Sequence, residues 1–206
     1  MKNSYNEDYF ERGVELGISG YSNFRWIPEL TIPMCARMVE ILGIEDHDTI
    51  LDFGCAKGYV VKAFRLLHKR AWGVDISEYA VGQADGDIKQ YLTAGPFEPA
   101  PEEQYTWIIA KDVFEHISYE ALPALLKTLR GHCESIFCIV PLAENGKYVV
   151  PWYEQDTTHI IREDLHWWWD RLVEAGFSVT SAEYNMPYIK SNYAKWDKGN
   201  GFFIGS

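Results

Sequence analysis

Apolar residues along this chain alternate between short continuous runs and runs in which they recur every three or four positions. Continuous runs are typical of strands covered on both faces, and the wider spacing is typical of amphipathic helices. The continuous runs predict strands at 49–53, 71–74, 91–94, 105–110, 135–140, 177–184 and 201–204. Helical spacing predicts helices at 32–42, 59–69, 78–84, 118–130 and 162–175, the third of them capped by Ser77. This alternation predicts one α/β domain over residues 1–206, built on a mostly parallel sheet.

Three segments carry no regular period. Residues 1–30 are aromatic and punctuated by glycine, and such a segment cannot form a core by itself. We therefore expect an N-terminal arm or lid that packs on the rest of the domain. Residues 143–160 are polar and rich in aromatic residues, which predicts a long loop after the fifth strand. Residues 187–200 also predict an irregular loop.

Composition narrows the classes of partner. The chain has 206 residues and a net charge of −11. This charge does not favour a nucleic-acid partner, because phosphate backbones are bound by clusters of lysine and arginine. No apolar run approaches the roughly 20 residues of a membrane helix, and the polar start over residues 1–8 is unlike a signal peptide. We expect a cytoplasmic enzyme with a small-molecule partner, no membrane association and an undetermined oligomeric state.

The cysteines do not predict a metal site. None of the four belongs to a Cys-x-x-Cys pair, so a zinc site is not expected. Reduced thiols in a cytoplasmic protein are the expected state.

The most informative stretch is Thr49–Gly58, which reads Thr-Ile-Leu-Asp-Phe-Gly-Cys-Ala-Lys-Gly. A strand, a glycine-rich turn and a helix start together predict a cradle for a nucleotide cofactor. Seventeen residues past Gly58, the next strand ends in Asp75, where an acidic side chain would meet ribose hydroxyls.

The same loop departs from the phosphate-binding patterns. Ala56 stands at the third position of the dinucleotide glycine motif, and Lys57 is not followed by Ser or Thr as in a P-loop. A shorter cradle suits a cofactor without phosphate, with backbone N–H groups on a carboxylate and Asp52 on an ammonium group. S-adenosylmethionine has such an amino-acid tail.

Four stretches in order resemble the class I S-adenosylmethionine-dependent methyltransferases. They are Asp-Phe-Gly-Cys-Ala-Lys-Gly at 52–58, Gly-Val-Asp-Ile-Ser at 73–77, Trp-Ile-Ile-Ala-Lys-Asp-Val-Phe-Glu-His at 107–116, and the His, Trp-Trp and Ala-Gly-Phe elements between 159 and 177. The resemblance implies S-adenosylmethionine as cofactor. It also implies a Rossmann-like, seven-stranded, mostly parallel sheet with helices on both faces and the last strand antiparallel.

The resemblance also implies a set of cofactor contacts. The residues expected at the methionine end are Asp52, Gly54, Cys55 and Gly58. Asp75 is expected on the ribose hydroxyls, Ile76 on the adenine ring and Asp112 beside the cofactor. On the arm, Tyr21 is a candidate to face the sulfonium, and Arg25 is a candidate to pair with the cofactor carboxylate. The acid that often meets adenine after the third strand is missing, since Gly95-Pro96 stands there.

Methyl transfer from a sulfonium is an in-line displacement, so the protein mainly aligns the acceptor and helps it to lose its proton. The candidate base or acceptor contact is His159 in the 143–160 loop, with Asp156 beside it; a histidine that only pins the loop is the alternative. These two residues are too few to predict a metal site. Glu115 and His116 follow the fourth strand and are expected to orient the methionine tail or bridge to the acceptor. A structural hydrogen bond is the alternative for His116.

The predicted function is S-adenosylmethionine-dependent methyl transfer to a small-molecule acceptor, with a hydroxyl of a saccharide or metabolite as the leading candidate. N- or C-methylation and a non-catalytic cofactor-binding or partner module on the same fold remain alternatives. A nucleotide-dependent oxidoreductase is disfavoured by Ala56 and by the lack of a Tyr-x-x-x-Lys pair.

Overall fold

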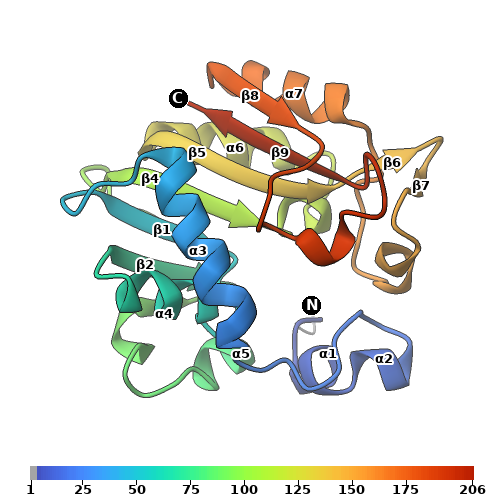
Figure 1. Cartoon of the computed structure of the whole chain (residues 1–206), viewed down its shortest axis with the longest axis horizontal. Helices are drawn as coiled ribbons and strands as arrows, with labels where there is room; N and C mark the ends of the chain where they lie inside the picture. The colour runs from blue at the N-terminus through green and yellow to red at the C-terminus, as the bar shows by residue number, and fades with distance from the viewer. Residues whose placement is uncertain (1–3) are drawn as a thin grey trace.

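A seven-stranded sheet forms the centre of the computed structural model, which describes residues 4–206 (Figure 1). The strand order is β3-β2-β1-β4-β5-β9-β8. The strands are β1 (Thr49–Phe53), β2 (Arg70–Asp75), β3 (Leu92–Ala94), β4 (Tyr105–Lys111), β5 (Cys133–Pro141), β8 (Val179–Glu183) and β9 (Asn200–Gly205). From β3 to β5 all neighbours are parallel, whereas β9 runs antiparallel to both β5 and β8. The predicted fold class is confirmed.

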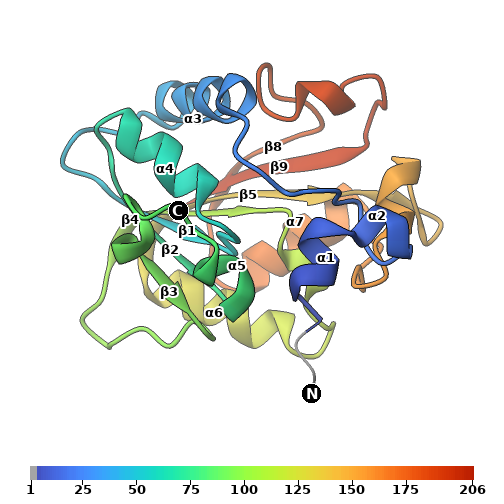
Figure 2. The ribbon, with the colours of Figure 1, turned by 90° about the horizontal axis from the view of Figure 1, so that it is seen from below.

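Helices cover both faces of the sheet (Figure 2). One face packs against α3 (Pro28–Leu42) and α4 (Tyr59–Leu66), and the other against α6 (Leu122–Gly131) and α7 (Leu165–Glu174). Successive residues of one strand enter opposite cores: Ile50 lies on the α3 side and Leu51 on the α6 side. Because side chains alternate along a strand, burial on both faces requires the continuous apolar runs seen in the sequence.

The N-terminal segment contains two short helices, α1 (Glu7–Glu11) and α2 (Gly13–Leu16). The sequence pattern, which has no helical period here, did not predict them. The helices are five and four residues long, too short to leave a periodic signal. A side-chain cap marks the start of α1, where Oδ1 of Asn6 accepts from the amide of Tyr9. The predicted arm is described from residue 4, and residues 1–3 lie outside the described part of the chain.

Helix boundaries differ from prediction where capping residues decide them. Helix α3 begins at Pro28, four residues earlier than expected, because proline fits the first turn of a helix. Helix α7 begins after Asp164, whose Oδ1 accepts from the amide of Trp167 at 2.9 Å, instead of at residue 162. Helix α5 (Glu78–Gly82) is capped by Ser77 as predicted.

Both predicted loops contain local structure. The 143–160 loop holds the hairpin of β6 (Ala143–Glu144) and β7 (Lys147–Tyr148), followed by the 3-10 helix η3 (Pro151–Gln155). The 187–200 loop holds η4 (Ser191–Tyr193). The other 3-10 helices are η1 (Lys89–Tyr91) and η2 (Phe114–His116). In the part of the chain described, no helix combines the length and apolar character that crossing a bilayer requires.

Candidate functional site

The loop from β1 to α4 has a shape that only glycine permits at two positions. Gly54 and Gly58 have φ angles of 79° and 75°, in the left-handed region. A Cβ on Gly54 would lie 2.3 Å from Cγ2 of Val113, and one on Gly58 would lie 2.6 Å from Cδ1 of Leu92. The loop is thus packed tightly against the end of β4 on one side and against β3 on the other.

Asp75 ties this loop to the end of β2. Its Oδ2 accepts from the amide of Ala56 at 2.7 Å, and its Oδ1 accepts from the amide of Ser77 at 2.8 Å. Burial raises the pKa of Asp75, and these two hydrogen bonds oppose that shift. A carboxylate has about four lone-pair sites, so two bonds leave Asp75 able to accept from the ribose hydroxyls predicted for it.

The other loop amides are used within the protein. The amides of Gly54 and Cys55 donate to the carbonyl oxygen of Val74, and the amide of Gly58 donates to that of Cys55. The expectation that loop N–H groups take a cofactor carboxylate stays a prediction, and these three amides already have protein acceptors. These bonds shape the cradle.

Asp52 fits a cationic ligand. Its side chain lies on β1 and is only 3% exposed. Burial raises the pKa of Asp52 to about 7, although the charge of Lys111 opposes the shift. A ligand ammonium beside this carboxylate would compensate the lost hydration, which agrees with the amino-acid tail of S-adenosylmethionine.

Beyond Asp75, Ile76 offers an apolar surface. It is 57% exposed, unusual for a large aliphatic side chain at the carboxyl end of a central strand. This position suits the predicted contact with the adenine ring.

The N-terminal arm is fixed to the cradle through a buried lysine. Nζ of Lys57 lies 2.5 Å from Oε1 of Glu11 and donates to the carbonyl of Phe24 at 2.7 Å. The predicted Tyr21 belongs to the arm's aromatic cluster with Tyr9, whereas the predicted Arg25 is solvent-exposed. Sequence reasoning considered Lys57 only as a phosphate ligand and missed this role.

A second buried lysine, Lys190, lies beside the cradle and pairs with Asp112. Asp112, with a left-handed φ of 56°, is paired with Lys111 at 2.5 Å through Oδ2 and with Lys190 at 2.5 Å through Oδ1. Burial opposes ionisation, yet the two lysines hold the pKa of Asp112 well below its usual range. The carboxylate predicted to contact the cofactor is thus already engaged by two cations. Lys190 was missed because it lies in the irregular 187–200 loop.

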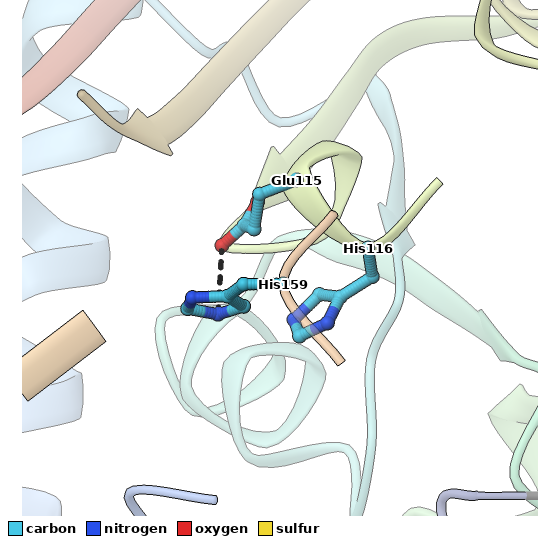
Figure 3. A group of neighbouring side chains, drawn as sticks. All are labelled: Glu115, His116 and His159. Atoms are coloured by element: carbon cyan, nitrogen blue, oxygen red, sulfur yellow. Dashed lines mark ion pairs between the residues drawn. The ribbon is translucent and has the colours of Figure 1, made fainter. Parts of the chain in front are cut away.

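Glu115, His116 and His159 form one cluster at the carboxyl end of β4 (Figure 3). Backbone bonds hold the two segments together, because the carbonyl of Glu115 accepts from the amides of residues 160 and 161 at 2.8 and 3.0 Å. Nε2 of His159 lies 3.9 Å from Oε1 of Glu115, and the two imidazole rings are 4.7 Å apart. We call these three residues the Glu115 cluster.

The Glu115 side chain is the most isolated polar group of the site. It is 1% exposed, and neither carboxylate oxygen has a hydrogen-bond partner among the described residues. Burial and the charge of Asp112 hold the pKa of Glu115 well above its usual range.

Hydrogen bonds define the state of both histidines. Nδ1 of His159 lies 2.9 Å from the carbonyl oxygen of Tyr153, which only accepts, so Nδ1 carries the proton. Nδ1 of His116 lies 2.8 Å from the hydroxyl of Thr158, whose own proton goes to Asp156 at 2.5 Å. Burial lowers the pKa of His116 to about 4 and also lowers that of His159. Both rings are therefore neutral and carry a lone pair on Nε2.

Asp156 supports the cluster from behind. Its Oδ1 accepts from the amide and hydroxyl of Thr158, and its Oδ2 accepts from the hydroxyl of Tyr9 on the arm at 2.7 Å. With both oxygens occupied, Asp156 is placed to orient Thr158 and His116. These bonds favour a positioning role for Asp156, and the catalytic role expected of it stays a prediction.

Comparison with known proteins places the chain in a wider group. A family model described as "Methyltransferase domain" matches residues 28–184. A putative methyltransferase of Haloferax volcanii, solved with its Trm112 activator, is similar over 86% of this chain and 90% of its own, with 16% identity and a TM-score of 0.66. An S-adenosylmethionine-dependent methyltransferase of Archaeoglobus fulgidus is similar over 83% and 91% of the two chains, with 16% identity and a TM-score of 0.66. The glycopeptide N-methyltransferase MtfA is similar over 85% and 95%, with 11% identity and a TM-score of 0.62. No curated protein sequence matches the chain.

Proposed function

This chain belongs to the methyltransferase-domain family and is an S-adenosylmethionine-dependent methyltransferase, and from that premise we propose that it methylates a hydroxyl group of a small molecule, such as a saccharide or another metabolite. Its cradle residues support this proposal at the cofactor end. Asp52 would bind the ammonium group of S-adenosylmethionine, Asp75 would bind the ribose hydroxyls and Ile76 would pack on adenine.

When bound, S-adenosylmethionine supplies a methyl group: the acceptor lone pair forms the new bond to carbon while the carbon–sulfur bond breaks and leaves its electrons on sulfur. The chain's own residues align the acceptor, exclude water and help the acceptor to lose its proton. The arm is the candidate lid, because Glu11 contacts Lys57 of the cradle and Tyr9 contacts Asp156 of the acceptor-side loop.

The observation that carries the choice of a hydroxyl is the Glu115 cluster next to the cradle. Val113, two residues before Glu115, packs on Gly54, the first residue of the cradle loop, so the cluster follows a segment that touches the cradle. A hydroxyl is a much weaker acid than an ammonium group and needs a dedicated group to take or displace its proton. Two neutral imidazoles and a carboxylate in a buried site supply that chemistry.

The four free and buried cysteines support a reducing compartment, such as the cytoplasm, as the place where the protein works.

The experiment is methyl transfer from labelled S-adenosylmethionine to a panel of saccharides, phenols and amines, with cofactor affinity measured separately by calorimetry. We expect hydroxyl compounds to be methylated. We also expect His159→Ala to lose at least about 100-fold in turnover while its cofactor affinity stays within a factor of two, since general catalysis of this kind contributes 10²–10⁴-fold. His166→Ala changes an exposed histidine and is the matched control. Transfer only to amines, or full turnover by His159→Ala, would overturn the proposal.

A further inference from the structure

We propose that Glu115, His116 and His159 bind a divalent transition-metal cation, of the class of Zn²⁺ or Mn²⁺, at the acceptor end of the site. The binding itself is inferred from these side chains alone. Only the role of the cation in catalysis rests on the proposed methylation of a hydroxyl.

The first observation is the unpartnered carboxylate of Glu115. Buried polar groups in folded proteins are almost always hydrogen-bonded, and an exception requires an explanation such as a bound ion. Both oxygens of Glu115 lack a partner among the described residues, and the side chain is 1% exposed. Figure 3 shows this carboxylate directly above the His159 ring and facing its Nε2. The group is therefore aimed at a place that holds no protein donor.

The second observation is the orientation of the two imidazoles. In each ring Nδ1 donates away from the cluster, to the carbonyl of Tyr153 from His159 and to the hydroxyl of Thr158 from His116. Histidines that bind metals almost always use one nitrogen for the ion and donate from the other to a carbonyl, carboxylate or similar group. The Asp156–Thr158–His116 chain of hydrogen bonds is an outer-shell arrangement of this kind.

The third observation is the spacing of the ligand atoms. One atom from each of the three residues lies within 4.8 Å of the others, and Nε2 of His159 is 3.9 Å from Oε1 of Glu115. That distance is too long for a hydrogen bond. Two ligands that each bind one cation at about 2.1 Å lie at most about 4.2 Å apart, so the 3.9 Å pair fits a shared ion as it stands. The widest spacing, of up to 4.8 Å, requires these side chains to move closer together when the ion binds.

The ligand types decide the class of cation. Two imidazoles and one carboxylate are a common set for Zn²⁺ and related first-row ions, whereas Mg²⁺ and Ca²⁺ prefer oxygen ligands. The carboxylate of Asp156, 3.9 Å from Nε2 of His159, adds negative charge next to the ion. Two lysines lie nearby, Lys111 and Lys190, and both pair with Asp112.

Three protein ligands leave coordination positions open, as in catalytic metal sites. If the proposed function holds, the acceptor hydroxyl would occupy one of them. The cation would lower the pKa of that hydroxyl, its proton would pass to solvent, and the resulting alkoxide would take the methyl group. The cation is neither oxidised nor reduced in this step.

The test is a titration of chelator-treated protein with Zn²⁺, Mn²⁺ and Mg²⁺ by calorimetry, together with elemental analysis of the purified protein. We expect one Zn²⁺ or Mn²⁺ per chain, and weaker binding of Mg²⁺. Glu115→Gln and His159→Ala should each weaken binding at least about 100-fold, and Asp156→Asn, which acts from the outer shell, about 10- to 100-fold. His166→Ala should bind as the unchanged protein does.

Circular dichroism and cofactor affinity of each variant distinguish loss of the ion from loss of the fold. Absence of stoichiometric Zn²⁺ and Mn²⁺ binding, or equal affinity in Glu115→Gln, would overturn the proposal. Hydroxyl methylation that persists in chelator would refute the catalytic role of the cation while leaving the proposed function intact. Stoichiometric binding without any hydroxyl acceptor would refute the function and leave the metal site standing.

Discussion

The hydroxyl of Tyr9 donates a hydrogen bond of 2.7 Å to Oδ2 of Asp156, across 147 positions of the chain and in a buried environment. Tyr9 belongs to the N-terminal arm, and Asp156 belongs to the loop that carries His159. The amide of Thr157 also donates to the carbonyl of Ile18 on the arm at 3.0 Å. The arm therefore connects the cradle, through Glu11 and Lys57, with the Glu115 cluster.

Removal of the Tyr9 hydroxyl should loosen that connection. Tyr9→Phe leaves Oδ2 of Asp156 without its donor in a buried site, which costs about 1–3 kcal/mol. We expect lower thermal stability and faster hydrogen exchange in residues 5–24, both measurable on the purified protein. Tyr119→Phe removes a hydroxyl bonded to Glu163 at an exposed position and is the control, with an expected loss below about 1 kcal/mol. If Tyr9→Phe and Tyr119→Phe lower the thermal stability equally, the buried bond from Tyr9 to Asp156 contributes no more than an exposed one.

Asp52 should make both stability and cofactor binding depend on pH. Its pKa is about 7 in the folded protein, against 3.8 ordinarily, because of burial. The folded state therefore holds a proton that the unfolded state loses, and this group's contribution to stability falls as pH rises from about 4 to about 7. Binding of the cofactor ammonium needs the carboxylate, so affinity should rise with pH up to about 7 and then level off.

Asp52→Asn tests both statements at once. In the variant, the fall in stability that Asp52 causes between about pH 4 and pH 7 should be absent. At pH 8 the variant should therefore unfold at a higher temperature than the unchanged protein. It should also bind S-adenosylmethionine at least about tenfold more weakly, because an uncharged amide cannot pair with an ammonium group. Calorimetry at pH 6 and pH 8 measures the affinities. An unchanged affinity would remove Asp52 from the cofactor site.

Gly54 should not tolerate a side chain. Gly54→Ala places a methyl group 2.3 Å from Cγ2 of Val113 in a left-handed backbone, which costs about 1–2 kcal/mol for the backbone alone. Overpacking adds about 1–3 kcal/mol, and Val113→Ala in the same chain should recover part of that second cost. Gly82→Ala in α5, where nothing lies within 4 Å, should be neutral or stabilising. Chemical denaturation of these three variants and the unchanged protein compares their free energies of unfolding.

The sheet and the cradle could be predicted because local sequence determines them. Strand 49–53 has the predicted bounds, since Ile50, Leu51 and Phe53 form a short apolar segment that ends at the glycine of the following turn. The helix starts at Pro28 and Leu165 were missed, because an early proline and the cap at Asp164 set the boundaries without changing the apolar period. Periodicity reports which face of a helix is buried and is insensitive to its first turn.

The candidate site was predicted only in part, because tertiary contacts assemble it. Asp52, Asp75 and the loop glycines follow a local motif, and the structure brings them together. Lys190 lies in a segment without a period, and no local signal indicated that its ammonium group reaches Asp112. The Glu115 cluster needed the fold as well, because His159 reaches Glu115 only through the backbone bonds between their segments.

Lys190 should stabilise the site through Asp112 and hold His159 in position through Tyr153. Its Nζ lies 2.5 Å from Oδ1 of Asp112 and 4.8 Å from the ring centre of Tyr153, whose carbonyl receives Nδ1–H of His159. Lys190→Met removes one partner of a buried ion pair, which costs about 3–5 kcal/mol when the remaining charge has no other partner. Lys111 still pairs with Asp112, so we expect the lower part of that range. Lys195→Met, at an exposed position, should stay within about 0.5 kcal/mol of the unchanged protein.

The kinetic effect of Lys190→Met distinguishes coupling from simple destabilisation. If Lys190 fixes Tyr153 and thereby His159, turnover should fall and the KM for the acceptor should rise at a temperature where the variant remains folded. The affinity for S-adenosylmethionine should change little, because Lys190 contacts Tyr153 of the 143–160 loop and is not among the residues expected to bind the cofactor. A parallel loss of cofactor affinity would instead place Lys190 at the methionine end, and unchanged kinetics in a folded variant would limit it to stability.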